Sequence, residues 1–219
     1  MAGVLLVDDS WDGLAENATI HGRTPTFQTS PGTYGVDPNT STSIVGGGSN
    51  TIKFNEIGAA FKMVTAVENY AVQLIVNDNG VNERIVLFLR DNQSTPYQRY
   101  GLWVSYVTRE FGGTSGYFRV ASSNNYSSVA LFPDFPWTYD SSGINKFAFE
   151  ANSSTFRVII NDVVATTFTN TTWPPNGARS RVGVSFGSAG PSNARATRFS
   201  VYDSIDVVEQ TSYPVVRFG

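Results

Sequence analysis

Alternation of apolar and polar residues with a period of two dominates this sequence and limits the folds open to it. Residues 70–76 (YAVQLIV) and 101–107 (GLWVSYV) are short runs rich in β-branched and aromatic residues, which is the usual composition of strands. Residues 146–151 (KFAFEA) alternate so that Phe147 and Phe149 share one face of an extended segment. Such a segment is typical of a strand that buries one face against a core and leaves the other in water.

Turn-forming residues separate the apolar runs. Asn161 and Asp162 stand alone between residues 156–160 and 163–168, and a two-residue link of this kind predicts a tight β-hairpin. No window of helical length carries an apolar stripe with a period of about 3.6 residues. We therefore predict an all-β fold, a two-sheet antiparallel jelly-roll sandwich with roughly a dozen strands.

Length and composition narrow the choice further. The chain has 219 residues, which suits one large domain; we assign residues 1–206 to a single jelly-roll domain and residues 207–219 to a C-terminal tail or edge strand. The lack of cysteine excludes disulfides and thiol chemistry, and the single histidine, His21, excludes a histidine metal cluster. We expect His21 to pack in, or at the edge of, a short strand at residues 18–23.

Charge and hydropathy exclude other classes of partner. A net charge of −3 with scattered arginines lacks the basic surface of a nucleic-acid-binding protein. The apolar runs are far shorter than the ~18 residues of a membrane-spanning helix, and the first residues lack the basic and apolar regions of a signal peptide. We therefore expect synthesis in a host cytoplasm, with no nucleic-acid or membrane partner.

Residues 24–50 are the least regular part of the sequence and contain three prolines and the run Gly46–Gly48. This run lacks the Gly-Lys-Ser/Thr ending of a phosphate-binding loop. We interpret it as a flexible turn in a long surface excursion, with one short strand at residues 43–45.

Several motifs occur in a familiar order. Residues 7–11 (VDDSW), the hairpin at 156–168 (FRVIINDVVATTF) and the closing strands at 181–186 and 196–201 carry the likeness. In this order they resemble the concanavalin A-like lectin/glucanase (laminin-G-like) jelly-roll domains of bacteriophage structural proteins. The resemblance implies the fold; it does not select one function, because this architecture hosts lectins, hydrolases and purely structural modules.

Carboxylates are poorly placed for glycoside hydrolysis. That reaction needs two carboxylates roughly 5–10 Å apart across the scissile bond. The glucanases of this fold, as the resemblance has it, take them from one strand with a Glu-x-Asp-x-Glu alternation. Here Glu150 stands alone in its strand, and Asp8 and Asp9 are adjacent and so point to opposite faces. We therefore expect no enzyme activity and no catalytic residue.

No cofactor is expected, and no metal site is assigned. The oxygen-rich stretch at residues 77–83, with Asp78 at its centre, suits a hairpin turn. A calcium ion near Asp78 is the alternative interpretation of the same residues.

The segment 131–139 (LFPDFPWTY) is dense in aromatic residues and prolines and shows no strand period. Three interpretations stay open: a cap over one end of the core, a protein interface, or a glycan-binding platform that uses exposed rings and amides. The residues of this candidate loop and of its polar neighbour are Phe132, Phe135, Trp137, Tyr139, Asn124, Asn125 and Tyr126.

We predict a non-enzymatic virion protein, a bacteriophage capsid decoration (cement) protein or a short head or tail fibre protein. Its partners would be other capsid or tail proteins and copies of itself in a homo-oligomer, with host surface polysaccharide as a further candidate. A receptor-binding lectin module is the alternative, and a glycoside hydrolase is the disfavoured third. The predicted docking tail contains Tyr213, Val215, Val216 and Phe218.

Overall fold

β-Strands are the regular elements of the chain wherever the computed structural model describes it. Among these residues there is no helix of the length and apolar character needed to cross a membrane. The described residues are 3–36, 44–54, 58–63, 69–77, 84–91, 100–107, 115–124, 127–138, 144–172, 181–186 and 195–203.

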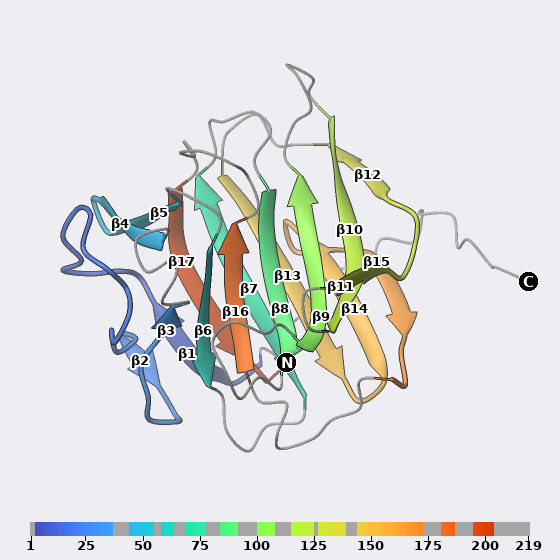
Figure 1. The fold of residues 1–219 in the computed structure, drawn as a ribbon, viewed down its shortest axis with the longest axis horizontal. Coiled ribbons are helices and arrows are strands. Elements are labelled where there is room, and N and C mark those ends of the chain that lie inside the picture. Colours follow the sequence, from blue (N-terminus) through green and yellow to red (C-terminus); the bar gives the residue numbers. More distant parts are fainter. Residues whose placement is uncertain are drawn as a thin grey trace, which may run out of the picture.

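The strands form two antiparallel sheets that lie one over the other (Figure 1). The nine-stranded sheet runs in the order β15 (Val163–Thr169), β14 (Thr155–Ile160), β13 (Ile144–Asn152), β7 (Tyr70–Asn77), β17 (Arg195–Tyr202), β1 (Leu5–Asp9) and β2 (Phe27–Gln28), with β5 (Thr51–Phe54) on β17 and β4 (Ile44–Gly48) on β5. The eight-stranded sheet runs in the order β11 (Ser127–Ala130), β10 (Ser115–Asn124), β9 (Tyr100–Val107), β8 (Arg84–Asp91), β16 (Arg181–Phe186), β6 (Gly58–Met63) and β3 (Gly35–Val36), with β12 (Phe135–Thr138) on β10.

This architecture confirms the predicted all-β, two-sheet sandwich. The described residues contain seventeen strands where we predicted roughly a dozen, because very short strands such as β2 and β3 have no recognisable alternation. The predicted hairpin at Asn161 and Asp162 is confirmed: both residues have positive φ angles, 51° and 65°, as a tight two-residue turn requires. Residues 207–219 lie outside the described part of the chain, so the tail stays a prediction.

The core fills the space between the sheets. Inward side chains such as Leu74, Phe147 and Phe199 come from alternate positions of their strands, as the period of two predicts. The hydroxyl of Tyr106, on the eight-stranded sheet, donates a hydrogen bond of 3.0 Å to the backbone oxygen of Ala148 on the nine-stranded sheet. This bond joins the two layers across an otherwise apolar interior.

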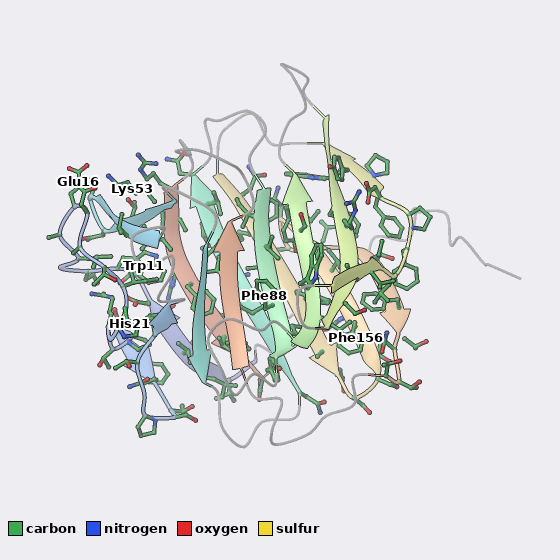
Figure 2. All side chains as sticks on the ribbon, in the orientation of Figure 1. Trp11, Glu16, His21, Lys53, Phe88 and Phe156 are labelled. Carbon is green, nitrogen blue, oxygen red and sulfur yellow. The ribbon has the colours of Figure 1, made fainter. Side chains whose placement is uncertain are left out.

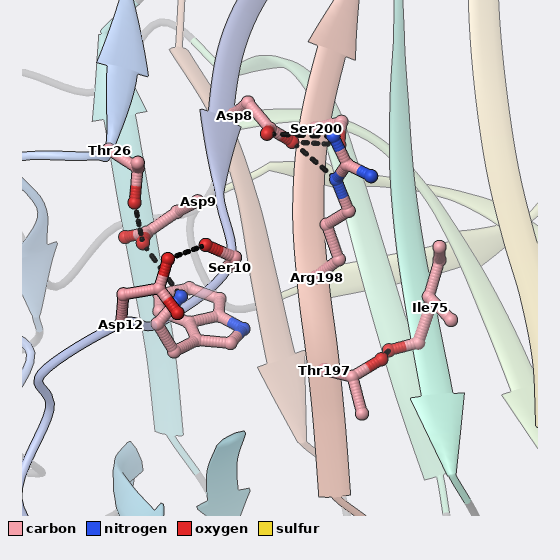
Figure 3. A network of polar contacts seen from close by, with 10 residues as sticks. Asp8, Asp9, Ser10, Asp12, Thr26, Ile75, Thr197, Arg198 and Ser200 are labelled. Atoms are coloured by element: carbon pink, nitrogen blue, oxygen red, sulfur yellow. Dashed lines mark hydrogen bonds and ion pairs between the residues drawn. The ribbon is translucent and has the colours of Figure 1, made fainter. Parts of the chain in front are cut away.

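Two adjacent carboxylates anchor the start of the chain on opposite sides of β1 (Figure 3). Asp8 accepts hydrogen bonds from Arg198 Nε and from Ser200 Oγ, both at 2.7 Å, which fix β1 against β17. Asp9 is fully buried and accepts hydrogen bonds from Nε and Nη2 of Arg23, at 3.0 and 2.9 Å. The hydrogen bond with Asp9 raises the pKa of the Arg23 guanidinium. The two carboxylates are therefore structural groups with arginine partners.

The glycine run corrects our interpretation of a flexible turn. Gly46 and Gly47 lie within strand β4, and a Cβ atom on Gly46 would be 2.0 Å from the backbone oxygen of Ala15. Gly46 N also donates a 2.8 Å hydrogen bond to Ala18 O. Glycine is required here because two backbones approach closely.

His21 is a second correction. We expected it in a short strand, packed or at an edge, but it is exposed on a turn, and the neighbouring Thr19 makes only an isolated bridge to Val45. Figure 2 shows His21 among the blue N-terminal segments at the left of the view.

Candidate functional site

The predicted aromatic loop is in part a strand. Residues 135–138 form β12, which pairs with β10 and places Phe135 opposite Phe118. Their rings stack with centroids 4.9 Å apart. The absence of alternation misled our interpretation because a four-residue strand with a proline is too short to show a period.

The aromatic side chains of this segment face the core. Trp137 is only 8% exposed and packs edge-on against Phe147, with ring centroids 5.4 Å apart. Phe132 and Phe135 are half-buried, and Phe132 lies 5.0 Å from Phe168 between centroids. These are the contacts of a cap over one end of the core. A glycan or protein that used this segment would have to reach Phe132 and Phe135 rather than Trp137.

Of the other predicted site residues, only Asn124 lies in the part of the chain that the structure describes. Asn124 ends β10, where its backbone pairs with Tyr100 and Ser127. The remaining predicted residues lie outside the described part of the chain; they are Asn125, Tyr126, Tyr139, Asp78, Tyr213, Val215, Val216 and Phe218.

A second apolar cluster, which the sequence analysis missed, lies on the face of the eight-stranded sheet that points away from the core. It contains Val86, Phe88, Trp103 and Ala121, and we call it the outer cluster. Figure 2 labels Phe88 near the middle of this sheet. Because the main core uses Leu87 and its alternate neighbours, the outer cluster is separated from the core by the sheet itself.

Strand register builds the outer cluster. Phe88 lies directly opposite Trp103, and Trp103 lies directly opposite Ala121 on the next strand. Gly183 lies on the other side of Phe88 and adds no side chain. Small residues therefore flank two aromatic rings in one row across four strands. Directly opposed aromatic residues stabilise a sheet by up to about 1 kcal/mol per pair.

The signal for this cluster was present in residues 84–90 (RIVLFLR). A strand with one face in water alternates apolar and polar residues, whereas an unbroken apolar run predicts that both faces are covered. The structure agrees, because Phe88 is 1% and Trp103 8% exposed although both point away from the core. Trp103 is therefore the more accessible of the two rings.

Polar groups border the outer cluster. Arg119 lies opposite Ser105, diagonal to Trp103, at a Cβ separation of roughly 7–8 Å that long side chains bridge. Its Nε and Nη2 donate to the two carboxylate oxygens of Asp134, both at 2.7 Å. These hydrogen bonds raise the pKa of the Arg119 guanidinium. The guanidinium carbon also lies 6.0 Å from the ring centroid of Tyr117.

The border of this face brings a partly exposed phenol ring beside a guanidinium and a carboxylate. An aromatic ring beside a guanidinium, a carboxylate and a phenol can stack on a ligand ring and hydrogen-bond its substituents. Within the described part of the chain, no three histidine, cysteine, aspartate or glutamate side chains gather where a metal ion could bind.

Comparison with known proteins gives the fold. No family model matches the chain, and no curated protein matches it. LamA from Z. galactanivorans, in complex with laminaritriose and laminaritetraose, superposes with a TM-score of 0.56 and 12% identity over 92% of this chain and 100% of that chain. A structure from work on endo-acting O-glycanases of the human gut microbiota has a TM-score of 0.60 and 11% identity over 90% and 98% of the two chains.

The exoplasmic/lumenal domain of VIP36, in a Ca2+/Man-bound form, gives a TM-score of 0.57 and 13% identity over 90% of this chain and 92% of that chain. The chain therefore shares the two-sheet jelly-roll fold of these structures, which confirms the fold that the resemblance implied. Identities this low show the fold alone.

Proposed function

We propose that the protein is a carbohydrate-binding module and that it binds glycan on the outward face of the eight-stranded sheet. The observation that carries this proposal is the border of the outer cluster, where Tyr117, Arg119 and Asp134 are accessible beside the buried rings of Phe88 and Trp103 on the face that points away from the core. Aromatic rings stack on the apolar faces of sugars, and a few polar groups fix orientation. Three structures with this fold are of a laminari-oligosaccharide complex, a Man-bound form and an O-glycanase study, which supports the same class of ligand.

Each group has a distinct part in the proposed site. Tyr117 is the partly exposed ring that a sugar can reach, and the buried Trp103, with Phe88 opposite it, forms the floor of the site. Arg119 and Asp134 neutralise each other, so the border offers hydrogen bonds without net charge. This combination favours a neutral glycan over a polyanionic one, because a neutral border gives an acidic polymer no electrostatic gain.

Two tryptophans provide a matched test. Trp103 and Trp137 belong to the same sheet and are both 8% exposed, but Trp103 lies in the outer cluster and Trp137 in the core. We expect Trp103→Leu to weaken glycan affinity about tenfold, or roughly 1.4 kcal/mol, because the floor of the site is lost. Trp137→Leu should lower stability and leave the affinity of the folded fraction unchanged.

Affinity electrophoresis in laminarin and mannan gels, preceded by a glycan array, makes the measurement. Circular dichroism and thermal melts report whether each variant is folded. The proposal fails if the natural chain binds no glycan on the array or in the gels. It also fails if Trp137→Leu weakens binding as much as Trp103→Leu.

We further propose that binding is not followed by hydrolysis. Asp134 is the carboxylate among the described side chains of this face, and Arg119 holds both of its oxygens. Asp8 and Glu150 belong to the nine-stranded sheet, where Arg198 and Arg157 bind them. Reducing ends released from any polysaccharide that the protein binds would contradict this second proposal.

A further inference from the structure

Strand β15 forms one edge of the nine-stranded sheet (Figure 1). It pairs with β14 along its whole length, and no described strand pairs with its other side. The backbone N–H and C=O groups on an outer side of this kind can pair with another strand.

Two of the sequence features that usually blunt an edge, a charge and a proline, are missing from β15. Its residues, VVATTFT, include no charge and no proline. The other sheet edges differ: β2 and β3 have two residues each, β11 has four, and β12 contains Pro136. β4 is covered, because residues 17–19 bond to it. β15 is thus the longest uncovered edge among the described strands.

A β-bulge divides the strand. The register with β14 shifts between Val158 and Ile159, so the regular half of β15 is Thr166–Thr169. Thr167 and Thr169 are exposed in this half, and Phe168 is buried in the core. The half next to the bulge bends away, so the regular half is the one that can accept a partner strand.

We propose that two copies of the chain associate by antiparallel pairing of β15 through Thr166–Thr169, with Thr167 of each copy opposite Thr167 of the other. An added strand must be extended and must bring no charge that lacks a counterpart on this edge. Strand β15 of a second copy meets both conditions. A two-fold axis makes the two strands equivalent, so that each donates backbone hydrogen bonds to the other and accepts them in return. Pairing would oppose uncharged side chains, and Thr–Thr pairs across strands are favourable.

The charged residues next to the strand have partners in their own chain: Arg157, which lies opposite Thr167 on β14, is bonded to Glu150. Asp162 precedes β15 and is bonded to Lys146 of its own chain at 2.6 Å. An interface built on four residues of each strand is small, so the dimer forms and dissociates with concentration. This inference does not depend on glycan binding, although a dimer would carry two outer clusters and so gain avidity on a polymer.

Charge complementation at Thr167 tests the proposal. Sedimentation equilibrium of the natural chain should show an apparent mass that rises with concentration from one chain toward two. Thr167→Lys and Thr167→Glu should each remain monomeric, because two like charges meet at the edge. An equimolar mixture of the two variants should recover dimers, since opposite charges then face each other. Thr24→Lys, an exposed substitution in the loop between β1 and β2, is the control and should dimerise like the natural chain.

Each alternative outcome overturns the proposal. A natural chain that stays monomeric over the whole concentration range excludes the dimer. Dimers of Thr167→Lys alone, or a mixture that stays monomeric while both variants melt as folded proteins, exclude β15 as the interface. Circular dichroism of every variant identifies any loss of fold, and Thr167→Ser, which adds no charge, should dimerise normally.

Discussion

Two fully buried tyrosines differ in one respect, the partner of the hydroxyl group. Tyr106 donates to the backbone oxygen of Ala148 at 3.0 Å, whereas the Tyr34 hydroxyl has no hydrogen-bond partner among the described residues. Tyr106→Phe should therefore lower the free energy of unfolding by about 1 kcal/mol, the net value of one buried hydrogen bond. Tyr34→Phe should leave the free energy of unfolding unchanged or raise it, because the substitution removes a buried polar atom without removing a hydrogen bond.

Urea denaturation of the two variants beside the natural chain measures this difference. Both substitutions remove one oxygen from a buried ring, so the packing change is the same. An equal loss in the two variants would mean that the Tyr34 hydroxyl has an internal partner, such as the nearby Asp9 carboxylate.

The same two hydroxyls make stability depend on pH in the alkaline range. Burial raises the pKa of Tyr106 and Tyr34 well above the ordinary value of 10.0, and the nearby Asp9 charge raises that of Tyr34 further. Above pH 10.0 the folded chain keeps protons that the unfolded chain has released. The unfolded state then binds fewer protons, so the free energy of unfolding falls as the pH rises. The two tyrosines contribute nothing to the slope at neutral pH.

Each group should contribute about 1.4 kcal/mol per pH unit to that fall. The double variant Tyr34→Phe/Tyr106→Phe should lose both contributions and show a flatter curve than the natural chain. Urea denaturation at a series of pH values on both sides of 10.0 makes the comparison. Curves of equal slope would show that these hydroxyls ionise in the folded state.

At the scale of elements, strand β4 depends on how closely its backbone approaches residues 15–18. Gly46→Ala would place a methyl group 2.0 Å from Ala15 O, and only a backbone shift relieves that contact. Gly48 has a φ of +76° and open space around it, so Gly48→Ala meets strain but no clash. We expect losses of stability of about 3 kcal/mol for Gly46→Ala and about 1 kcal/mol for Gly48→Ala.

Thermal and urea unfolding of the two variants gives the ranking. The pair is matched because both substitutions add one methyl group to the same strand. A loss for Gly48→Ala as large as that for Gly46→Ala would mean that the close approach to Ala15 contributes little.

Strands long enough to show apolar alternation were predictable from the sequence, whereas elements determined by contacts between distant residues were not. Residues 146–151 revealed their strand because neighbouring side chains alternate, and the structure places the strand at Ile144–Asn152. The short strand predicted at residues 43–45 is the start of β4, but its glycine run and β12 were misinterpreted, because a close backbone approach and a four-residue pairing depend on residues far apart in the sequence. Neither contact can be recognised in a short stretch of sequence.

The candidate site was missed for a related reason. Trp103 and Phe88 come from different strands, and only the register places them opposite each other. The aromatic density of segment 131–139 is visible in the sequence, but the direction of Trp137 depends on the pairing of β12 with β10. Unbroken apolar runs on neighbouring strands were the one signal that indicated a second covered face.

At the scale of the whole molecule, the first and last described strands lie side by side. β1 pairs with β17, Asp203 N donates to Val4 O at 3.0 Å, and Val4 N donates to Asp203 Oδ1 at 2.6 Å. The first and last described strands thus meet before the predicted tail begins. This pairing makes the tail a segment that can be removed without breaking any described strand pairing.

Deletion of residues 207–219 should therefore leave the fold and its thermal midpoint nearly unchanged. If the protein is the virion component that we predict, the truncated chain should lose its incorporation into particles, because the apolar residues 213–218 are the predicted docking segment. A chain that carries the same thirteen tail residues in scrambled order is the matched control, since it keeps length and composition. Co-sedimentation with particles and circular dichroism make the two measurements. Incorporation that persists after deletion would end the docking role, whereas a large fall in the melting temperature would move the domain boundary beyond residue 206.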